Sequence, residues 1–351
     1  MKVLKRLLLL MSIFVLSTMF LIYQKTNVRI LCLERNPAKV SVFLSDFNDD
    51  LISEIRKNLE EIEKKNDDKV EYNFYDGKLN QKNQNDEIEK VLEEGTDLIL
   101  LNIVDRAYSK TVIDKIKANN VPVILFNREP LTSVPIQSYG RAIYIGTDPV
   151  KAGILQGEML IDLWNSNKKY IDRNNDGILQ YYMLEGEGDN TEATERTKYV
   201  ISTIEKSGIK TQQVGIDFAN WSEKAAYEHT REAFEKYSLD IDVIIANDDS
   251  MAIGAVKALQ EYGYNKGEKS KTIPVVGVDV IPKAKEFIEK GYMLGSVYQD
   301  PKDYAKALYE VGMNLINYKD PVADTKYTLD DTKVSIRIPH TNYFYNNIFA
   351  K

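Results

Sequence analysis

Oxygen-bearing side chains recur at alternate positions in one short segment of this chain, and a glycine follows the third of them. A loop of this kind directs side-chain oxygens from positions 1, 3, 5 and 9, and the backbone carbonyl of position 7, toward one centre. These positions are held, in that order, by Asp172, Asn174, Asp176, Gln180 and Ile178. Gly177 permits the sharp turn. Because every ligand is a hard oxygen, the segment predicts a structural calcium ion (Ca2+).

The loop is not a complete EF-hand. Position 12, where an EF-hand has a bidentate glutamate, is Met183, and the residues after Leu179 are typical of a strand. The missing acid must therefore come from elsewhere in the chain. Because Asp, Asn and Gly also favour turns, a polar turn without a metal is the alternative interpretation.

Composition restricts the class of protein. The chain has 351 residues, enough for two domains, and its 43% hydrophobic and 28% charged residues are ordinary for a globular protein with a substantial core. A net charge of −7 argues against nucleic-acid binding. The histidines, His229 and His340, are far apart and lie in no catalytic or zinc motif. We therefore expect no histidine-centred catalysis.

The N-terminus predicts export from the cytoplasm. Basic residues at positions 2, 5 and 6 precede an uncharged apolar run from Leu7 to Tyr23. Its length is at the lower limit for spanning a bilayer, and no Ala-x-Ala cleavage site follows, so a removed signal and an uncleaved anchor both stay open. The single cysteine, Cys32, follows a leucine where a lipid-attachment signal would have a small residue. A single cysteine also excludes an internal disulfide.

From residue 39 onward, short apolar runs alternate with amphipathic stretches. The first series has expected strands at 40–44, 70–74, 98–101 and 121–126 and helices at 50–64, 84–94 and 108–119. The second has strands at 144–146, 180–184, 211–215, 243–246, 275–278 and 294–298 and helices at 151–165, 192–207, 223–237, 251–262 and 282–290. A helix at 304–317 and a strand at 334–338 end the chain. Apolar runs without polar alternation indicate strands covered on both faces, hence parallel sheets.

We therefore predict an α/β fold of two doubly wound parallel-sheet lobes joined by a hinge. The expected N-terminal lobe is 40–126 plus 300–333, and the expected C-terminal lobe, with the calcium loop, is 127–299 plus 334–351. Residues 1–38 are the signal or anchor segment and a linker.

Polar side chains follow most of the expected strands. Ligands of open parallel sheets bind at the carboxyl ends of the strands, so these residues are the ones to examine. They are Asp46–Asp49, Asn102, Asp105, Glu185–Asn190, Phe218–Trp221, Asn247–Asp249, Asp279, Gln299 and Asp300. A set of carboxylates, amides and aromatics without a nucleophile beside a base favours a polyhydroxyl-binding cleft. Asp249 and Asp300 are also typical helix N-caps, and Trp221 could be a core residue.

Several segments carry a family resemblance. Leu101-Asn-Ile-Val-Asp105, Asn127-Arg-Glu-Pro130, Gly153-Ile-Leu-Gln-Gly157 and Ile245-Ala-Asn-Asp-Asp-Ser-Met-Ala-Ile-Gly-Ala255 resemble the bacterial galactose/glucose-binding proteins of sugar ABC transporters. The resemblance covers about 39–338 and implies the periplasmic binding protein fold of type I. It is specific because that family carries a calcium loop in its second lobe, which matches residues 172–180.

The resemblance implies which residues bind the sugar. Five positions keep the family's residue types: Asp49, Asn102, Arg196, Trp221 and Asp279. Five depart from it: Leu51 for a phenylalanine that stacks opposite the tryptophan, Asn190 for a histidine, Glu192 for an aspartate, Asp248 for an asparagine and Gln299 for an asparagine. The family's distant bidentate calcium glutamate falls at Asp242, which is one methylene shorter.

These departures predict an altered site. Losing one ring of the aromatic sandwich removes about 1 kcal/mol of stacking, which Phe47 or Tyr298 could partly restore. Asp248 removes a donor and adds a negative charge. The more acidic cleft favours either a shifted preference, for example toward an amino sugar, or a hexose that binds less tightly.

The expected function is an extracytoplasmic, monomeric, calcium-stabilised protein that closes its lobes around a galactose-like or glucose-like monosaccharide and presents it to an ABC permease. It is expected not to be an enzyme. The first alternative is a membrane-anchored sugar sensor that signals to a receptor or histidine kinase. A sugar-processing enzyme with Glu192 and Asp248 as acid and base is a second alternative. A repressor is excluded because no helix-turn-helix precedes residue 39.

Overall fold

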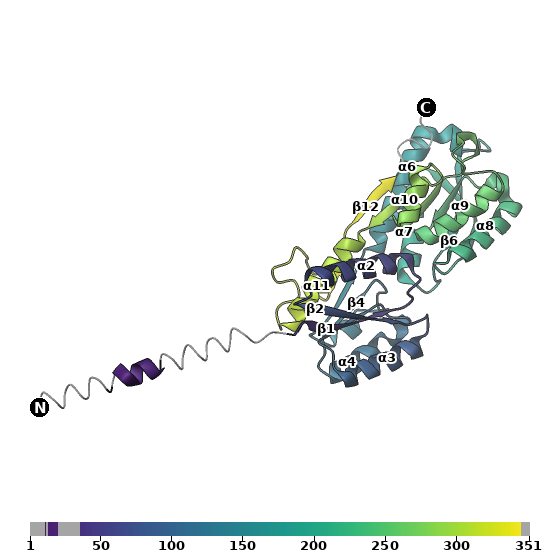
Figure 1. Ribbon diagram of the computed structural model, residues 1–351. Helices are drawn as coiled ribbons and strands as arrows, with labels where there is room; N and C mark the ends of the chain where they lie inside the picture. The colour runs from purple at the N-terminus through teal and green to yellow at the C-terminus, as the bar shows by residue number, and fades with distance from the viewer. Residues whose placement is uncertain (1–10, 12, 20–35, 345–351) are drawn as a thin grey trace, which may run out of the picture.

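The computed structural model describes residues 11, 13–19 and 36–344, and Figure 1 shows two lobes with the second stacked above the first. Each lobe is built on a six-stranded sheet. The spatial order of strands is β11-β5-β4-β3-β1-β2 in the first lobe and β12-β10-β9-β8-β6-β7 in the second. The two lobes therefore repeat one arrangement of strands, and the predicted fold class is confirmed.

The strands have the following bounds. The first sheet contains β11 (Ser335–Arg337), β5 (Ala142–Gly146), β4 (Val123–Phe126), β3 (Leu98–Leu101), β1 (Ala38–Leu44) and β2 (Val70–Asp76). The second contains β12 (His340–Phe344), β10 (Gly295–Gln299), β9 (Val275–Asp279), β8 (Val243–Ala246), β6 (Ile178–Glu185) and β7 (Lys210–Phe218). All neighbours in both sheets are parallel except β10 and β12, which are antiparallel.

Helices cover both faces of each sheet. The first lobe has α2 (Asp50–Lys65), α3 (Gln81–Glu94), α4 (Ser109–Ala118), α5 (Val134–Gln137), α11 (Pro301–Ile316) and the 3₁₀ turn η1 (Arg106–Tyr108). The second has α6 (Pro149–Ile171), α7 (Thr191–Lys206), α8 (Glu223–Tyr237), α9 (Asp249–Glu261), α10 (Pro282–Glu289) and the 3₁₀ turns η2 (Ser238–Asp240) and η3 (Lys269–Lys271).

The cores explain why the central strands read as continuous apolar runs. All residues of β3, β4 and β8 are buried. In the first lobe one apolar layer packs under α2 and α11 and the other under α3 and α4. In the second lobe one layer packs under α8, α9 and α10 and the other under α6 and α7. A strand with helices on both faces has no polar side, so it cannot alternate.

The lobe boundaries need a correction. Residues 127–146 and 334–337 were expected in the second lobe, but β5 pairs with β4, and β11 pairs with β5, so both strands belong to the first sheet. Within residues 36–344 the chain crosses between lobes three times: after β5, after β10 and after β11. A hydrophobic run predicts that a strand exists. Which strands it pairs with depends on the tertiary structure.

The N-terminal apolar run is only partly within the described residues. Residues 13–19 are helical, with exposed apolar side chains such as Phe14 and Leu16, and Figure 1 shows them away from the lobes. Among the described residues, no helix combines the length and apolar character needed to cross a bilayer. The rest of the apolar run and Cys32 lie outside the described residues.

Candidate functional site

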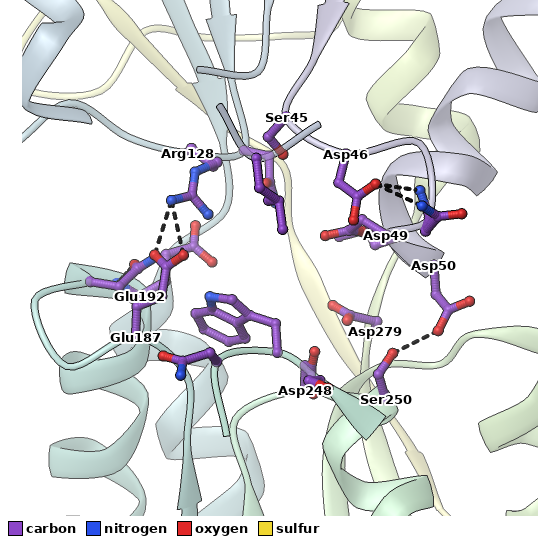
Figure 2. A pocket seen from close by; sticks show the side chains of 18 of the residues that line it. Ser45, Asp46, Asp49, Asp50, Arg128, Glu187, Glu192, Asp248, Ser250 and Asp279 are labelled. Atoms are coloured by element: carbon purple, nitrogen blue, oxygen red, sulfur yellow. Dashed lines mark hydrogen bonds and ion pairs between the residues drawn. The ribbon is translucent and has the colours of Figure 1, made fainter. Parts of the chain in front are cut away.

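A cavity of about 720 Å³ lies between the lobes, where the carboxyl ends of both sheets face each other (Figure 2). Its polar lining is Ser45, Asp46, Asn48, Asp49, Asp50, Asn127, Arg128, Glu187, Asn190, Glu192, Arg196, Asn220, Ser222, Glu223, Lys224, Asp248, Ser250, Asp279 and Gln299. Leu51, Leu79, Val104 and Trp221 add apolar surface. Every sugar-contact residue expected from the sequence lines this cavity except Asn102.

The first lobe contributes the start of α2. Asp49 is the N-cap of this helix, and its Oδ1 accepts a hydrogen bond from the Ile52 backbone N–H at 2.9 Å. Burial raises the pKa of the Asp49 carboxyl, and the nearby charge of Asp50 adds to the effect. Leu51 follows in the first turn with 6% of its surface exposed. A helix cap thus fixes one carboxylate at the cavity wall.

Asn102 lies beneath the cavity and does not line it. Its side chain is fully buried, its Oδ1 accepts from the Ser45 N–H at 3.0 Å, and its Nδ2 donates to Asn127 Oδ1 at 3.1 Å. Asn127, the first residue after β4, has a φ of 60° and is the amide that reaches the cavity. Asn102, expected as a sugar contact, is therefore not part of the cavity wall, whereas Asn127 is. The rule that polar residues follow strand ends also applies to Asn127, and could have found it.

A buried ion pair anchors the second lobe's side of the cavity. Arg196 Nη2 and Glu192 Oε2, one helical turn apart on α7, are 2.5 Å apart, with 3% and 11% of their side chains exposed. Arg196 Nη1 also donates to the Asn247 carbonyl at 2.8 Å. Burial raises the pKa of Glu192, while the Arg196 charge opposes this. Asn190 caps α7 by accepting from the Glu192 N–H at 2.9 Å.

Trp221 covers one wall of the cavity. Its φ of 63° turns the chain sharply between β7 and α8. A Cβ on Gly186 would lie 2.3 Å from the indole ring, so only glycine lets the ring lie at this wall. The indole Nε1 is buried and has no hydrogen-bond partner in the described chain. Its place in the lining, beneath open space, favours the platform interpretation over that of a core residue.

Two buried aspartates face the cavity from the second lobe. Asp248 caps α9 through a 2.8 Å hydrogen bond from the Met251 N–H, and burial raises its pKa to about 7, with the Asp49 charge adding to the shift. The N-cap is thus Asp248 and not Asp249. Asp279 has a φ of 119°, and burial also raises its pKa well above the ordinary value. Strained backbone of this kind clusters at functional sites.

Gln299 links the hinge to the same wall. Its Nε2 donates to Asp279 Oδ1, and its Oε1 accepts from the Thr147 hydroxyl at 3.1 Å. Thr147 and Gln299 adjoin two of the interlobe crossings. Asp300, the next residue, caps α11 as expected, by accepting from the Lys302 N–H at 3.0 Å.

Polar contacts across the cleft were missed from the sequence. Arg128 of the first lobe and Glu187 of the second form an ion pair at 3.0 Å, which Figure 2 shows at the edge of the cavity. On the opposite side of the view, the Ser250 hydroxyl donates to Asp50 Oδ2 at 2.7 Å. Arg128 and Glu187 follow strand ends, and Asp50 and Ser250 lie in the first turns of α2 and α9. A linear pattern does not say which of these residues meet across a cleft.

Neither proposed substitute for the missing aromatic ring lines the main cavity. Phe47 packs on the first-lobe core, with the Arg56 guanidinium 4.4 Å from its ring centre. Tyr298 lines a smaller neighbouring cavity of about 190 Å³, which shares Leu51 and Asp279 with the main one. The wall formed by Leu51 therefore stays aliphatic, and the idea that Phe47 or Tyr298 restores the stacking is wrong.

In the predicted cation loop, the carboxylates of Asp172 and Asp176 accept hydrogen bonds from other groups of the loop. Asp172 Oδ1 accepts from the Asp176 N–H, and its Oδ2 accepts from the Gly177 N–H, both at 3.0 Å. Asp176 Oδ1 accepts from the Ile178 N–H at 2.8 Å, and its Oδ2 accepts from Gln180 Nε2 at 2.7 Å.

Asp242 lies beside this loop. Its carboxylate accepts from the backbone N–H groups of Arg173 at 3.2 Å and Gln180 at 2.9 Å, and burial raises its pKa to about 6. The Oε1 of Gln180 is buried without a partner. The expected loop ligands and Asp242 are therefore neighbours, although within the described residues no cluster of three or more His, Cys, Asp or Glu is arranged to hold a metal.

Comparison with known proteins places this geometry in a family. Residues 40–320 match the model of the periplasmic binding protein domain family. The chain belongs to the periplasmic binding protein family. It is accordingly a binding protein and not an enzyme, and the alternative of Glu192 and Asp248 as an acid and base pair is withdrawn.

Individual relatives agree with this placement. The chain is 34% identical to the D-galactose/methyl-galactoside binding periplasmic protein of Haemophilus influenzae, over 88% of this chain and 90% of that protein. It is 22% identical to the ribose import binding protein of Bacillus subtilis, over 80% and 82% of the two chains. A crystal structure of an ABC transporter solute binding protein from Bacillus halodurans with bound myo-inositol has a TM-score of 0.73 at 20% identity, over 89% and 96%.

Proposed function

We propose that this protein captures a galactose-like or glucose-like monosaccharide outside the cytoplasm and presents it to an ABC permease. The observation that carries the proposal is the cavity itself: an indole wall and convergent carboxylate, amide and guanidinium groups, between lobes joined by three crossings. Sugar hydroxyls both donate and accept, so they satisfy such groups in pairs, while a flat ring face packs on Trp221. The similarity to the H. influenzae galactose-binding protein supports a hexose.

Lobe closure is the proposed signal. Arg128 with Glu187, and Ser250 with Asp50, are contacts that exist only when the lobes face each other closely. A sugar that completes the hydrogen bonds of buried groups in both lobes stabilises this closed arrangement. A permease would then recognise the closed pair of lobes.

Calorimetric titration of the purified 36–351 fragment with galactose, glucose and methyl galactoside tests the proposal. We expect saturable binding of at least one hexose, and we expect Trp221→Ala to weaken it about tenfold, because stacking contributes on the order of 1 kcal/mol and the cavity opens to water. Tyr318→Ala, an exposed ring just after α11 that does not line the cavity, is the control. Absence of binding to any of these hexoses and to their amino derivatives would refute the proposal.

A membrane-anchored sensor is the second candidate function. The exposed apolar side chains of residues 13–19 favour an N-terminal segment that stays in the membrane. N-terminal sequencing of the mature protein distinguishes the two: a start beyond residue 23 excludes a permanent anchor. An intact N-terminus in the membrane fraction would support the sensor.

We also propose that the loop from Asp172 to Gln180, together with Asp242, holds a structural calcium ion. Asp172, Asn174, Asp176 and Gln180 would supply side-chain oxygens and Ile178 its carbonyl. The unpartnered, buried Oε1 of Gln180 supports this, since a buried acceptor without a donor is costly unless a cation satisfies it. The ion would tie the start of β6 to the loop before β8.

Chelation tests the calcium proposal without any sugar. At a free calcium concentration about a hundred times its Kd, the ion would stabilise the fold by about 2.7 kcal/mol, which corresponds to a Tm rise of roughly 5–10 °C. Asp176→Ala should abolish the rise, while Asp86→Ala, an exposed aspartate on α3, should keep it. An equal Tm with calcium and with chelator would contradict the proposal.

A further inference from the structure

The cavity wall carries more acids than its ion pairs can neutralise. Its carboxylates outnumber its cations by eight to three. Three of the acids are neutralised by ion pairs: Glu187 by Arg128, Glu192 by Arg196 and Glu223 by Lys257. The aspartates of the wall have no such cation within the described residues. The acids of the wall that have no ion-pair partner are therefore all aspartates.

Three of these aspartates each have one carboxylate oxygen that can accept a further hydrogen bond. Asp49 and Asp248 each use one oxygen to cap a helix, and Asp279 uses one oxygen for the amide of Gln299. Within the described chain, the second oxygen of each carboxylate has no hydrogen-bond partner. Asp248 and Asp279 are only 8% exposed, and what exposure they have is toward the cavity. A bound ligand must supply their missing donors.

The three carboxylates share one side of the cavity. In Figure 2, Asp49, Asp248 and Asp279 surround the same space, with Asp50 beside them, while Arg128, Glu187 and Glu192 lie on the other side. Burial raises the pKa of Asp279, the Arg196 charge opposes this, and the negative charges of Asp249, Asp248 and Asp49 add to the rise. The cavity is therefore electrically asymmetric.

A cation on the ligand matches this asymmetry better than a hydroxyl does. A hydroxyl donates one hydrogen bond and brings no charge, whereas an ammonium group donates three and brings a full positive charge. Buried carboxylates that repel one another are stabilised by such a charge at close range. Hydroxyls suffice for the ion-paired side, where each charge already has its partner.

We propose that the preferred ligand is an amino sugar, with its ammonium group among Asp49, Asp248 and Asp279 and its ring on Trp221. This inference rests on the proposed function, because it names the class of monosaccharide that the same cavity takes. The remaining ring hydroxyls then meet other polar groups of the lining, namely Arg196, Glu192 and Asn127.

Matched sugar pairs test the inference. The purified protein is titrated by calorimetry with galactose and galactosamine, glucose and glucosamine, and mannose and mannosamine. The pH is set above the raised pKa of Asp248, about 7, and below the pKa of the sugar amine, so that both groups are charged. Within each pair only one hydroxyl becomes an ammonium. Hydrogen bonds to charged groups predict that at least one amino sugar binds about tenfold to a hundredfold more tightly than its partner. If every pair shows equal binding or favours the neutral sugar, the inference is wrong while the proposed function stands.

Two variants, Asp248→Asn and Asp279→Asn, show with one control whether the carboxylates cause the preference. Asp248→Asn keeps the size of the side chain and its capping oxygen but removes the charge, so the ratio of the two Kd values should fall toward one. Asp105→Asn is the matched control: Asp105 also follows a strand end and caps a turn, but it is exposed and does not line the cavity. The ratio should be unchanged in this control. An amino-sugar preference that survives Asp248→Asn and Asp279→Asn would overturn the inference, and failure of all six sugars to bind would instead overturn the proposed function.

Discussion

Asn102 and Asn247 occupy equivalent places in the two lobes. Each directly follows the fourth strand in the spatial order, β3 or β8, and each is fully buried. Each side-chain oxygen accepts, at 3.0 Å, the N–H of the first residue after the neighbouring strand: Ser45 after β1 in one lobe and Gly186 after β6 in the other. The two asparagines tie neighbouring strand ends together in the same way.

The residues around these asparagines differ in charge. Ile103 and Val104 follow Asn102, whereas the buried acids Asp248 and Asp249 follow Asn247. The end of β4 likewise presents the amide of Asn127, where the end of β9 presents Asp279. The framework is thus repeated, but the buried charge is concentrated in the second lobe. The two lobes share the hydrogen bonds that hold neighbouring strand ends together, whereas the residues that face the ligand differ between them.

The largest expected difference between the lobes is the loss of stability when the arginine of an ion pair is replaced by alanine. Arg196→Ala leaves Glu192 buried without its partner and should lower the free energy of unfolding by about 3–5 kcal/mol. Arg128→Ala removes a pair whose side chains are 15% and 28% exposed, so it should cost only about 0.2–1 kcal/mol. Urea denaturation of both variants measures this. Equal losses would mean that the second lobe has no special dependence on buried charge.

The asparagine pair should give equal, intermediate effects. Asn102→Ala and Asn247→Ala each leave a buried N–H without its acceptor, which should cost about 1–3 kcal/mol. Asn83→Ala, exposed on α3, is the control and should stay within about 0.5 kcal/mol of the parent. If denaturation shows that one lobe loses much more than the other, the structural equivalence fails.

The pH dependence of stability should follow the acids of the second lobe. Burial raises the folded-state pKa of Asp248 from the ordinary 3.8 to about 7, so the folded state holds this proton more tightly than the unfolded state. That contribution to stability is complete below 3.8 and is lost as the pH rises through about 7. Asp249 and Asp279 shift in the same direction.

The corresponding measurement is Tm against pH. We expect the parent Tm to rise by about 2–4 °C on acidification across this window, as for a change of about 1 kcal/mol. Asp248→Asn should flatten the profile. A Tm that is lowest at the acid end of the window would contradict the assigned burial of these carboxyls.

The smallest effect tests the aliphatic wall of the first lobe. Leu51→Phe places a ring across the cavity from Trp221 and should tighten hexose binding by about 1 kcal/mol, roughly fivefold. Leu51→Met, similar in volume and without a ring, is the control. Weaker binding in the phenylalanine variant alone would show that the cavity has no room for a second ring.

Much of the local structure follows from the residues themselves. The all-apolar runs of β3, β4 and β8 predict buried parallel strands, because a strand covered on both faces has no polar positions. Aspartates and asparagines after those strands predict the helix caps and the place of the cavity. The alternation of oxygen-bearing side chains from Asp172 to Gln180 predicts a cation loop, which stays a proposal until calcium is titrated.

Three-dimensional packing decided the rest. The choice of Asn127 over Asn102 for the cavity wall, and the place of β5 and β11 in the first sheet, depend on neighbours far away in the chain. The pKa of Asp248 and the pairing of Arg128 with Glu187 depend on burial and on opposing lobes. Residue type and periodicity act over a few positions of the chain, but the choice of strand neighbour, the degree of burial and the electrostatic field are properties of the whole folded molecule.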